Sequence, residues 1–123
     1  MDLDQETQEQ IQELQASEQI LQQLLMQKQA FQMELNETET ALTEIKDAEG
    51  DVFKIIGQIM IKKPKEKIKE DLEKKQKLIQ LRLSSIEKQE SALTESLTSL
   101  RDEIIKKLNP GNLKDKDDIE EKE

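Results

Sequence analysis

The chain has 123 residues, of which 38% are charged, 33% hydrophobic and 2% aromatic, and its formal net charge is −9. This length suffices for one domain, but the low apolar content argues against a compact globular core, so the chain is either disordered or helical with a narrow apolar seam. Cys and His are both missing, which excludes disulfides, Cys/His zinc sites and catalysis by a thiol or an imidazole.

The first predicted element is a helix within residues 1–48. It contains no Pro or Gly, and Asp2 and Asp4 suit the positive end of a helix dipole. Two series of residues spaced seven apart interleave by three and four, the a/d pattern of a coiled coil. The series are Leu14, Leu21, Lys28, Leu35 and Leu42, and Ser17, Leu24, Phe31, Thr38 and Ile45. A left-handed Gly50 would stop the chain from continuing this helix.

Residues 49–63 are predicted to form a β-hairpin. They concentrate the β-branched and large apolar residues of the chain around one glycine, as Val52, Phe53, Ile55, Ile56, Gly57, Ile59, Met60 and Ile61. Two turns fit: a two-residue Gly57-Gln58 turn that pairs Ile56 with Ile59, or a three-residue loop centred on Gly57. With either turn the hairpin leaves unpaired apolar edges, so we expect these residues to assemble with strands of other chains.

Residues 64–109 repeat the helical pattern. Pro64 suits the first turn of a helix, and Asn109-Pro110-Gly111 ends it. The heptad series are Leu72, Ile79, Ile86, Leu93 and Leu100, and Gln76, Leu83, Glu90, Leu97 and Ile104. Heptads sustained over five repeats argue against disorder. Similar helix lengths around a short connector predict an antiparallel pair, with Leu35 near Leu83 and both free ends at one tip.

Polar residues occupy three seam positions, at Lys28, Gln76 and Glu90. They either control the register of the two helices or extend their long side chains out of a thin, hydrated seam, and we favour the second interpretation.

The free ends carry scattered aliphatic residues. Because charged residues are expected to cover the remaining helix surface, these groups near the termini are the candidates for binding other proteins. They are Leu3, Ile11, Leu14, Ile104, Ile105 and Leu108, with Leu113 as a further candidate. The segment 110–123 is acidic and of low complexity, and we expect a disordered, solubilising tail.

The string "VFKIIGQIMIKKPKEKIKEDLEKKQKLIQLRL" resembles the β-type subunits of prefoldin, both archaeal β subunits and their eukaryotic counterparts. The hairpin motif carries the resemblance, and the flanking coiled coils match in length and position. The resemblance implies a mainly α fold: a long antiparallel two-helix coiled coil whose central β-hairpin pairs with other subunits into a β-barrel platform. It also implies a hexamer with α-type and further β-type subunits.

The resemblance implies the function of an ATP-independent chaperone. Such a holdase binds unfolded client proteins at the coiled-coil tips and delivers them to a group II chaperonin, without a cofactor. The alternative is a structural or tethering coiled coil that oligomerises through its hairpin. We do not expect an enzyme, since the many carboxylates lie on charged helical faces rather than in a sheltered pocket.

Location and further partners follow from composition. No apolar run approaches the about 20 residues that span a bilayer, and the polar N-terminus is not a targeting peptide. An acidic chain without an aromatic and basic platform is not expected to bind nucleic acid. We therefore expect a cytoplasmic protein without contacts to membranes or nucleic acids.

Overall fold

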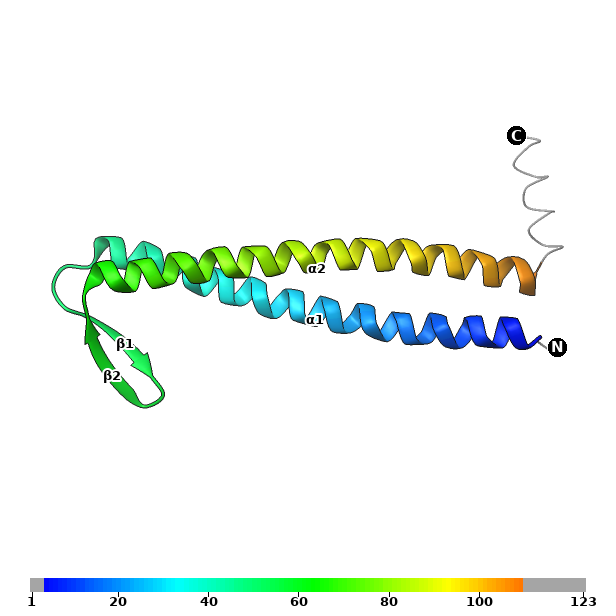
Figure 1. Ribbon diagram of the computed structural model, residues 1–123, viewed down its shortest axis with the longest axis horizontal. Helices are drawn as coiled ribbons and strands as arrows, with labels where there is room; N and C mark the ends of the chain where they lie inside the picture. The colour runs from blue at the N-terminus through cyan, green and yellow to red at the C-terminus, as the bar shows by residue number, and fades with distance from the viewer. Residues whose placement is uncertain (1–3, 110–123) are drawn as a thin grey trace, which may run out of the picture. The chain divides into compact units, whose positions relative to one another are not determined.

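The computed structural model describes residues 4–109, which form two long helices joined by a β-hairpin (Figure 1). Helix α1 spans Gln5–Asp47, strand β1 Val52–Ile56, strand β2 Ile59–Lys63, and helix α2 Lys65–Leu108. The mainly α fold with a central hairpin is thus confirmed. The acidic segment 110–123 lies outside the described residues.

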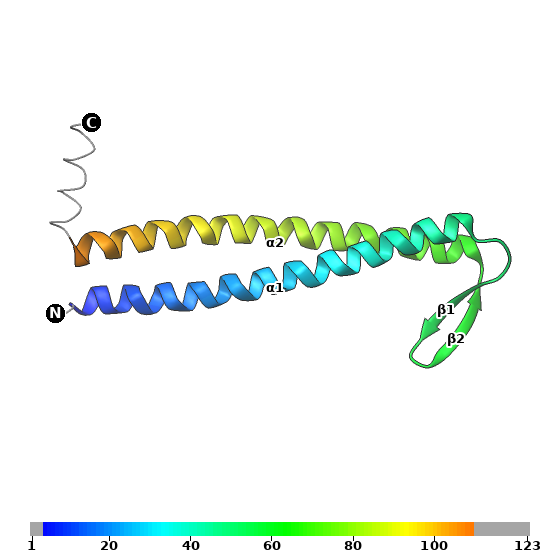
Figure 2. The same ribbon diagram turned by 180° about the vertical axis from the view of Figure 1, so that it is seen from behind.

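The described chain divides into two compact units. The terminal unit consists of residues 4–25 and 88–109, and the hairpin unit consists of residues 26–87. In each unit, a stretch of α1 and a stretch of α2 run side by side in opposite directions, as both views show (Figures 1 and 2). The antiparallel helix pair that the sequence predicted is therefore present in both units.

Helix α1 begins with a side-chain cap. The Thr7 amide donates a hydrogen bond of 2.7 Å to Oδ1 of Asp4, the residue immediately before the helix. This bond satisfies one of the amides that have no partner within a helix, and the negative charge suits the helix N-terminus. At the other end the helix stops at Asp47, and Gly50 has a φ of 93°. Only glycine adopts such a value without strain, so Gly50 lets the chain turn into β1.

Helix α2 begins directly after Pro64. The carbonyl oxygen of Pro64 accepts hydrogen bonds from the amides of Lys67 and Ile68, at 3.1 and 3.2 Å. Proline has no amide hydrogen to leave unsatisfied at this position. The helix ends at Leu108, where the amide of Asn109 still donates to the Ile105 carbonyl.

The buried side chains follow the heptad series. Every buried apolar residue belongs to one of them: Leu24, Ile45, Ile79, Leu83, Ile86, Leu97 and Ile104. Thr38, also on the seam, is buried too, and its hydroxyl donates to the Glu34 carbonyl at 2.8 Å, which satisfies the polar group without a partner across the seam. Burial of this stripe is the main source of stability for such helices, since isolated helices are marginal in water.

Contacts between the two helices of the hairpin unit follow an antiparallel order. The Arg82 guanidinium lies 5.7 Å from the centre of the Phe31 ring, and Lys75 forms an ion pair of 3.4 Å with Glu34. Leu42 and Gln76, from opposite helices, line one groove. The pairing of Leu35 with Leu83 stays a prediction, because heptads define which face is buried but leave the axial offset free.

Several apolar side chains lie exposed along the helices of the hairpin unit. Met26 is 70% exposed, Met33 65%, Leu78 50% and Leu81 70%. All four are off the seam. The expectation that charged residues cover the helices between the hairpin and the termini was therefore wrong for these positions.

Candidate assembly and binding surfaces

The hairpin has the two-residue turn. The register pairs Val52 with Lys63, Ile55 with Met60, and Ile56 with Ile59. Gly57 has a φ of 61°, and no non-glycine residue of the described chain has a positive φ. Positive φ at the first turn position alone is the pattern of a type II′ turn, whose twist matches that of paired strands. The structure thus decides between the two turns that the sequence left open.

Both faces of this hairpin are apolar near the turn. Strand alternation and the register place Ile56, Ile59 and Ile61 on one face, and Ile55 and Met60 on the other. All five are exposed, at 38–69%. A hairpin that packs one face against its own chain has one apolar and one polar face. Apolar residues on both faces therefore leave two exposed apolar surfaces on this hairpin.

The base of the hairpin is different. Strand β2 ends in Lys62 and Lys63, and Lys62 forms an exposed ion pair of 3.2 Å with Asp51. Phe53 and Val52 line a groove of about 440 Å³ with helix residues that include Ile45 and Leu72. The exposed apolar surface is therefore concentrated toward the turn, whereas the base of the hairpin lies against the helix ends.

In the terminal unit, ion pairs connect the two helices near both ends of the described chain. Lys107 Nζ lies 3.1 Å from Oε1 of Glu6 and donates to Oε1 of Gln10 at 3.0 Å. Arg101 Nη2 lies 3.1 Å from Oε1 of Glu18. Such exposed pairs each contribute well under about 1 kcal/mol, but they define which residues face each other.

The candidate binding residues of the terminal unit differ in accessibility. Ile105 is 41% exposed, whereas Ile11, Leu14 and Leu108 are half-buried. Ile104 is only 5% exposed because it lies in the heptad seam, so its prediction as an accessible contact was wrong. The further candidates Leu3 and Leu113 lie outside the described residues.

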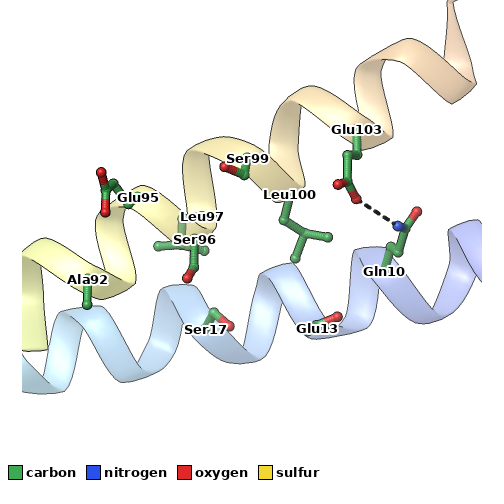
Figure 3. Close-up of a pocket in the computed structure, with 10 residues that line it drawn as sticks. All are labelled: Gln10, Glu13, Ser17, Ala92, Glu95, Ser96, Leu97, Ser99, Leu100 and Glu103. Carbon is green, nitrogen blue, oxygen red and sulfur yellow. Dashed lines mark hydrogen bonds between the residues drawn. The ribbon is translucent and has the colours of Figure 1, made fainter.

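A groove of about 700 Å³ lies between the two helices of the terminal unit (Figure 3). Its lining is Gln10, Glu13, Ser17, Ala92, Glu95, Ser96, Leu97, Ser99, Leu100 and Glu103. Ser17 comes from α1 and Ser96 from α2, and both line the groove. Ser17 occupies a seam position where the next two heptads carry Leu24 and Phe31, and its small side chain leaves space between the helices.

Comparison with known proteins assigns the family. Residues 8–110 match the family model described as prefoldin subunit. The chain belongs to the prefoldin family. A prefoldin subunit beta of Thermococcus onnurineus is 36% identical over 100 residues, which cover 80% of this chain and 86% of the relative. One of Pyrobaculum neutrophilum is 37% identical over 90 residues, covering 72% of this chain and 71% of the relative.

A solved prefoldin structure shares the fold. The crystal structure of the prefoldin beta subunit from Thermococcus strain KS-1 matches with a TM-score of 0.76 and 32% identity. The match covers 85% of this chain and 93% of that chain. The resemblance of the hairpin and its flanking helices to prefoldin β-type subunits is thus confirmed by family, sequence and structure.

Sequence reasoning missed two structural contributions of this prefoldin chain. Lys65 donates to carbonyls at the end of α1, and the groove at Ser17 opens between the helices. The small residue at the heptad position of Ser17 could have predicted the groove. No sequence pattern predicts the hydrogen bonds of Lys65. None of the helices in residues 4–109 combines the length and apolar character needed to cross a membrane.

Proposed function

We propose that this chain is a β-type subunit of a prefoldin hexamer, an ATP-independent chaperone that holds non-native proteins. The observation that carries the proposal is the hairpin with two exposed apolar faces in a chain of the prefoldin family. Val52, Phe53, Ile55, Ile56, Gly57, Ile59, Met60 and Ile61 are the proposed assembly residues. They would pair with hairpins of α-type and further β-type subunits through strand addition and burial of apolar surface.

Client binding is proposed for the terminal unit. Non-native proteins expose apolar side chains, and Ile105 together with the half-buried Ile11, Leu14 and Leu108 offers aliphatic surface to them. Each contact buries little area and is weak, at about 25 cal/mol per Å². Several subunits acting on one client would raise the overall affinity, because each further contact forms at a high effective concentration.

The last part of the proposal concerns a group II chaperonin. Delivery of clients to a group II chaperonin is inferred from membership of the prefoldin family alone. A structural tether is the competing function, and the family match with its chaperone relatives favours the holdase.

The test is an aggregation assay with the assembled complex and a chemically denatured test protein. Deleting residues 1–12 and 105–123 should abolish suppression of aggregation and leave the number of subunits unchanged, so that the mass of the assembly in analytical ultracentrifugation falls only by that of the deleted residues. The double substitution Ile105→Gln and Leu108→Gln should weaken the suppression of aggregation and leave the assembly intact.

A matched control addresses the exposed helix residues of the hairpin unit. Met26→Gln with Met33→Gln removes two apolar side chains that are more exposed than Ile105 and Leu108 and lie outside the terminal unit, and protection should persist. Protection that survives the truncation, or is lost in the methionine variant instead, would assign clients to another surface.

A further inference from the structure

The net charge of the chain is confined to part of its sequence. Residues 26–87, the hairpin unit, contain twelve acidic and twelve basic side chains. Residues 1–25 contain six acidic side chains and no basic one, and residues 88–109 contain four of each. The hairpin unit is therefore formally neutral, and the terminal unit is acidic. A one-sided charge of this kind selects binding partners by sign.

Two of the four basic side chains in residues 88–109 pair with acids that do not line the groove. Arg101 pairs with Glu18, and Lys107 with Glu6. Within the described residues, no ion pair reaches Glu13 or Glu95, and Glu103 accepts only the uncharged amide of Gln10, at 3.2 Å. The groove therefore carries acidic side chains from both helices without a paired cation.

The interior of the same groove offers space and a limited apolar surface. The small side chains of Ser17, Ala92 and Ser96 line it together with the half-buried Leu100, whereas Leu97 lies at its base and is only 4% exposed (Figure 3). Its volume of about 700 Å³ lies within the range of about 300–1,000 Å³ that ligand-binding clefts occupy. It is large enough for one or two bulky side chains of a bound segment, with carboxylates of Glu13, Glu95 and Glu103 along its length.

From this arrangement we infer that the groove binds extended client segments in which a large apolar side chain is flanked by Lys or Arg. The apolar side chain fills the space that Ser17 opens, and the flanking cations approach Glu13 and Glu95. The inference rests on the proposed holdase function and adds to it a preference for basic over acidic clients. Electrostatic complementarity supplies selectivity, while the apolar insertion supplies contact area.

The test uses three unstructured, fluorescently labelled peptides with the same Phe-Leu centre, flanked by Lys, Gln or Glu. Their binding to the assembled chaperone is measured by fluorescence anisotropy at low and high salt. The Lys-flanked peptide should bind about tenfold more tightly than the Glu-flanked one at low ionic strength, and added salt should shrink the difference. Equal affinities of the three peptides would overturn the inference.

Two variants test separately how the space in the groove and its negative charge contribute to peptide binding. Ser17→Leu restores a large heptad residue, so it should keep or raise the thermal midpoint while it weakens binding of the Lys-flanked peptide at least about fivefold. Glu13→Gln with Glu95→Gln should keep the Gln-flanked peptide bound and remove the preference for Lys. Unchanged binding in both variants would also overturn the inference.

Matched controls lie in the hairpin unit. Gln76→Leu places the same apolar residue at another polar seam position, and Glu37→Gln with Glu87→Gln removes two exposed acids. Both variants should bind peptides like the parent. If Ser17→Leu changes the mass of the assembly rather than peptide binding, the groove is a contact between subunits and the inference is wrong.

Failure of the inference differs from failure of the proposed function. If the terminal truncation abolishes protection against aggregation but the three peptides bind equally, the holdase function is supported. The inferred preference of the groove for basic segments is then wrong. If the truncation leaves protection intact, the proposed site of client binding falls regardless of the peptides.

Discussion

The ammonium group of Lys65 donates a hydrogen bond of 3.2 Å to the carbonyl oxygen of Ala48, and a second of 3.2 Å to the carbonyl of Lys46. Lys65 is the first residue of α2, and the two carbonyls lie at the end of α1, so this one side chain joins the two helices at the base of the hairpin. Carbonyls at a helix C-terminus have no partner within the helix and carry partial negative charge, and a cation there is favourable. The position of Lys65 at the N-terminus of its own helix is unfavourable by the same rule, which the bonds to α1 offset.

Replacing Lys65 by Met should therefore lower the free energy of unfolding by about 1 kcal/mol, since it keeps the aliphatic stem and removes the charged donor. Urea denaturation at fixed protein concentration, followed by circular dichroism, measures the change. Lys77→Met on the exposed surface of the same helix is the control and should leave the midpoint nearly unchanged. Equal midpoints for the two variants would show that the bonds of Lys65 contribute nothing.

The two apolar faces of the hairpin should each be required for assembly. Ile59→Lys with Ile61→Lys alters one face, and Ile55→Lys with Met60→Lys alters the other. A buried, unpaired lysine costs about 3 kcal/mol or more, so each double variant should dissociate the complex while its helical circular dichroism persists. Analytical ultracentrifugation checks the mass. An assembly that tolerates lysines on one face would mean that this face stays in solvent.

The cap of α1 should make the helix start sensitive to acid. Hydrogen bonds from the side chain and the amide of Thr7 lower the pKa of Asp4 below its ordinary value of 3.8. A carboxylate with a lowered pKa stabilises the folded state above its unfolded pKa, and this contribution is lost as the pH falls through the folded value. Asp4→Ala should thus speed hydrogen exchange of the Thr7 amide at neutral pH.

Measurement in acid is a control for the effect of Asp4→Ala on hydrogen exchange. At a pH well below 3.8 the difference between the parent and Asp4→Ala should shrink, when each rate is taken relative to its intrinsic value, because the parent carboxyl is then protonated and uncharged. Asp4→Asn retains a capping oxygen without the charge, so its exchange at neutral pH should lie between those of the parent and Asp4→Ala. A difference between parent and Asp4→Ala that persists unchanged into acid would exclude the charge of Asp4 as its cause.

The sequence by itself determined the elements of this protein. Heptad residues such as Ile79, Ile86 and Leu93 predict a helix with one buried stripe. The 3.6-residue period of a helix brings residues spaced by three, four and seven onto one face. The β-branched residues around Gly57 predict two strands and a turn, because branched side chains suit an extended backbone and glycine permits a positive φ. Family membership rests on the same local patterns.

Tertiary structure alone decided the relations between elements. Heptads define which face is buried but leave open which side chains meet across the helix pair, such as Arg82 with the Phe31 ring and Lys75 with Glu34. The same packing buries Ile104 and leaves Met26 exposed, although both are apolar helix residues. The bond from Lys65 to Ala48 joins residues seventeen apart and requires both helix ends to be in place. Local preferences act within a few residues of the chain, whereas these contacts depend on which surfaces the packed helices bring within reach of each other.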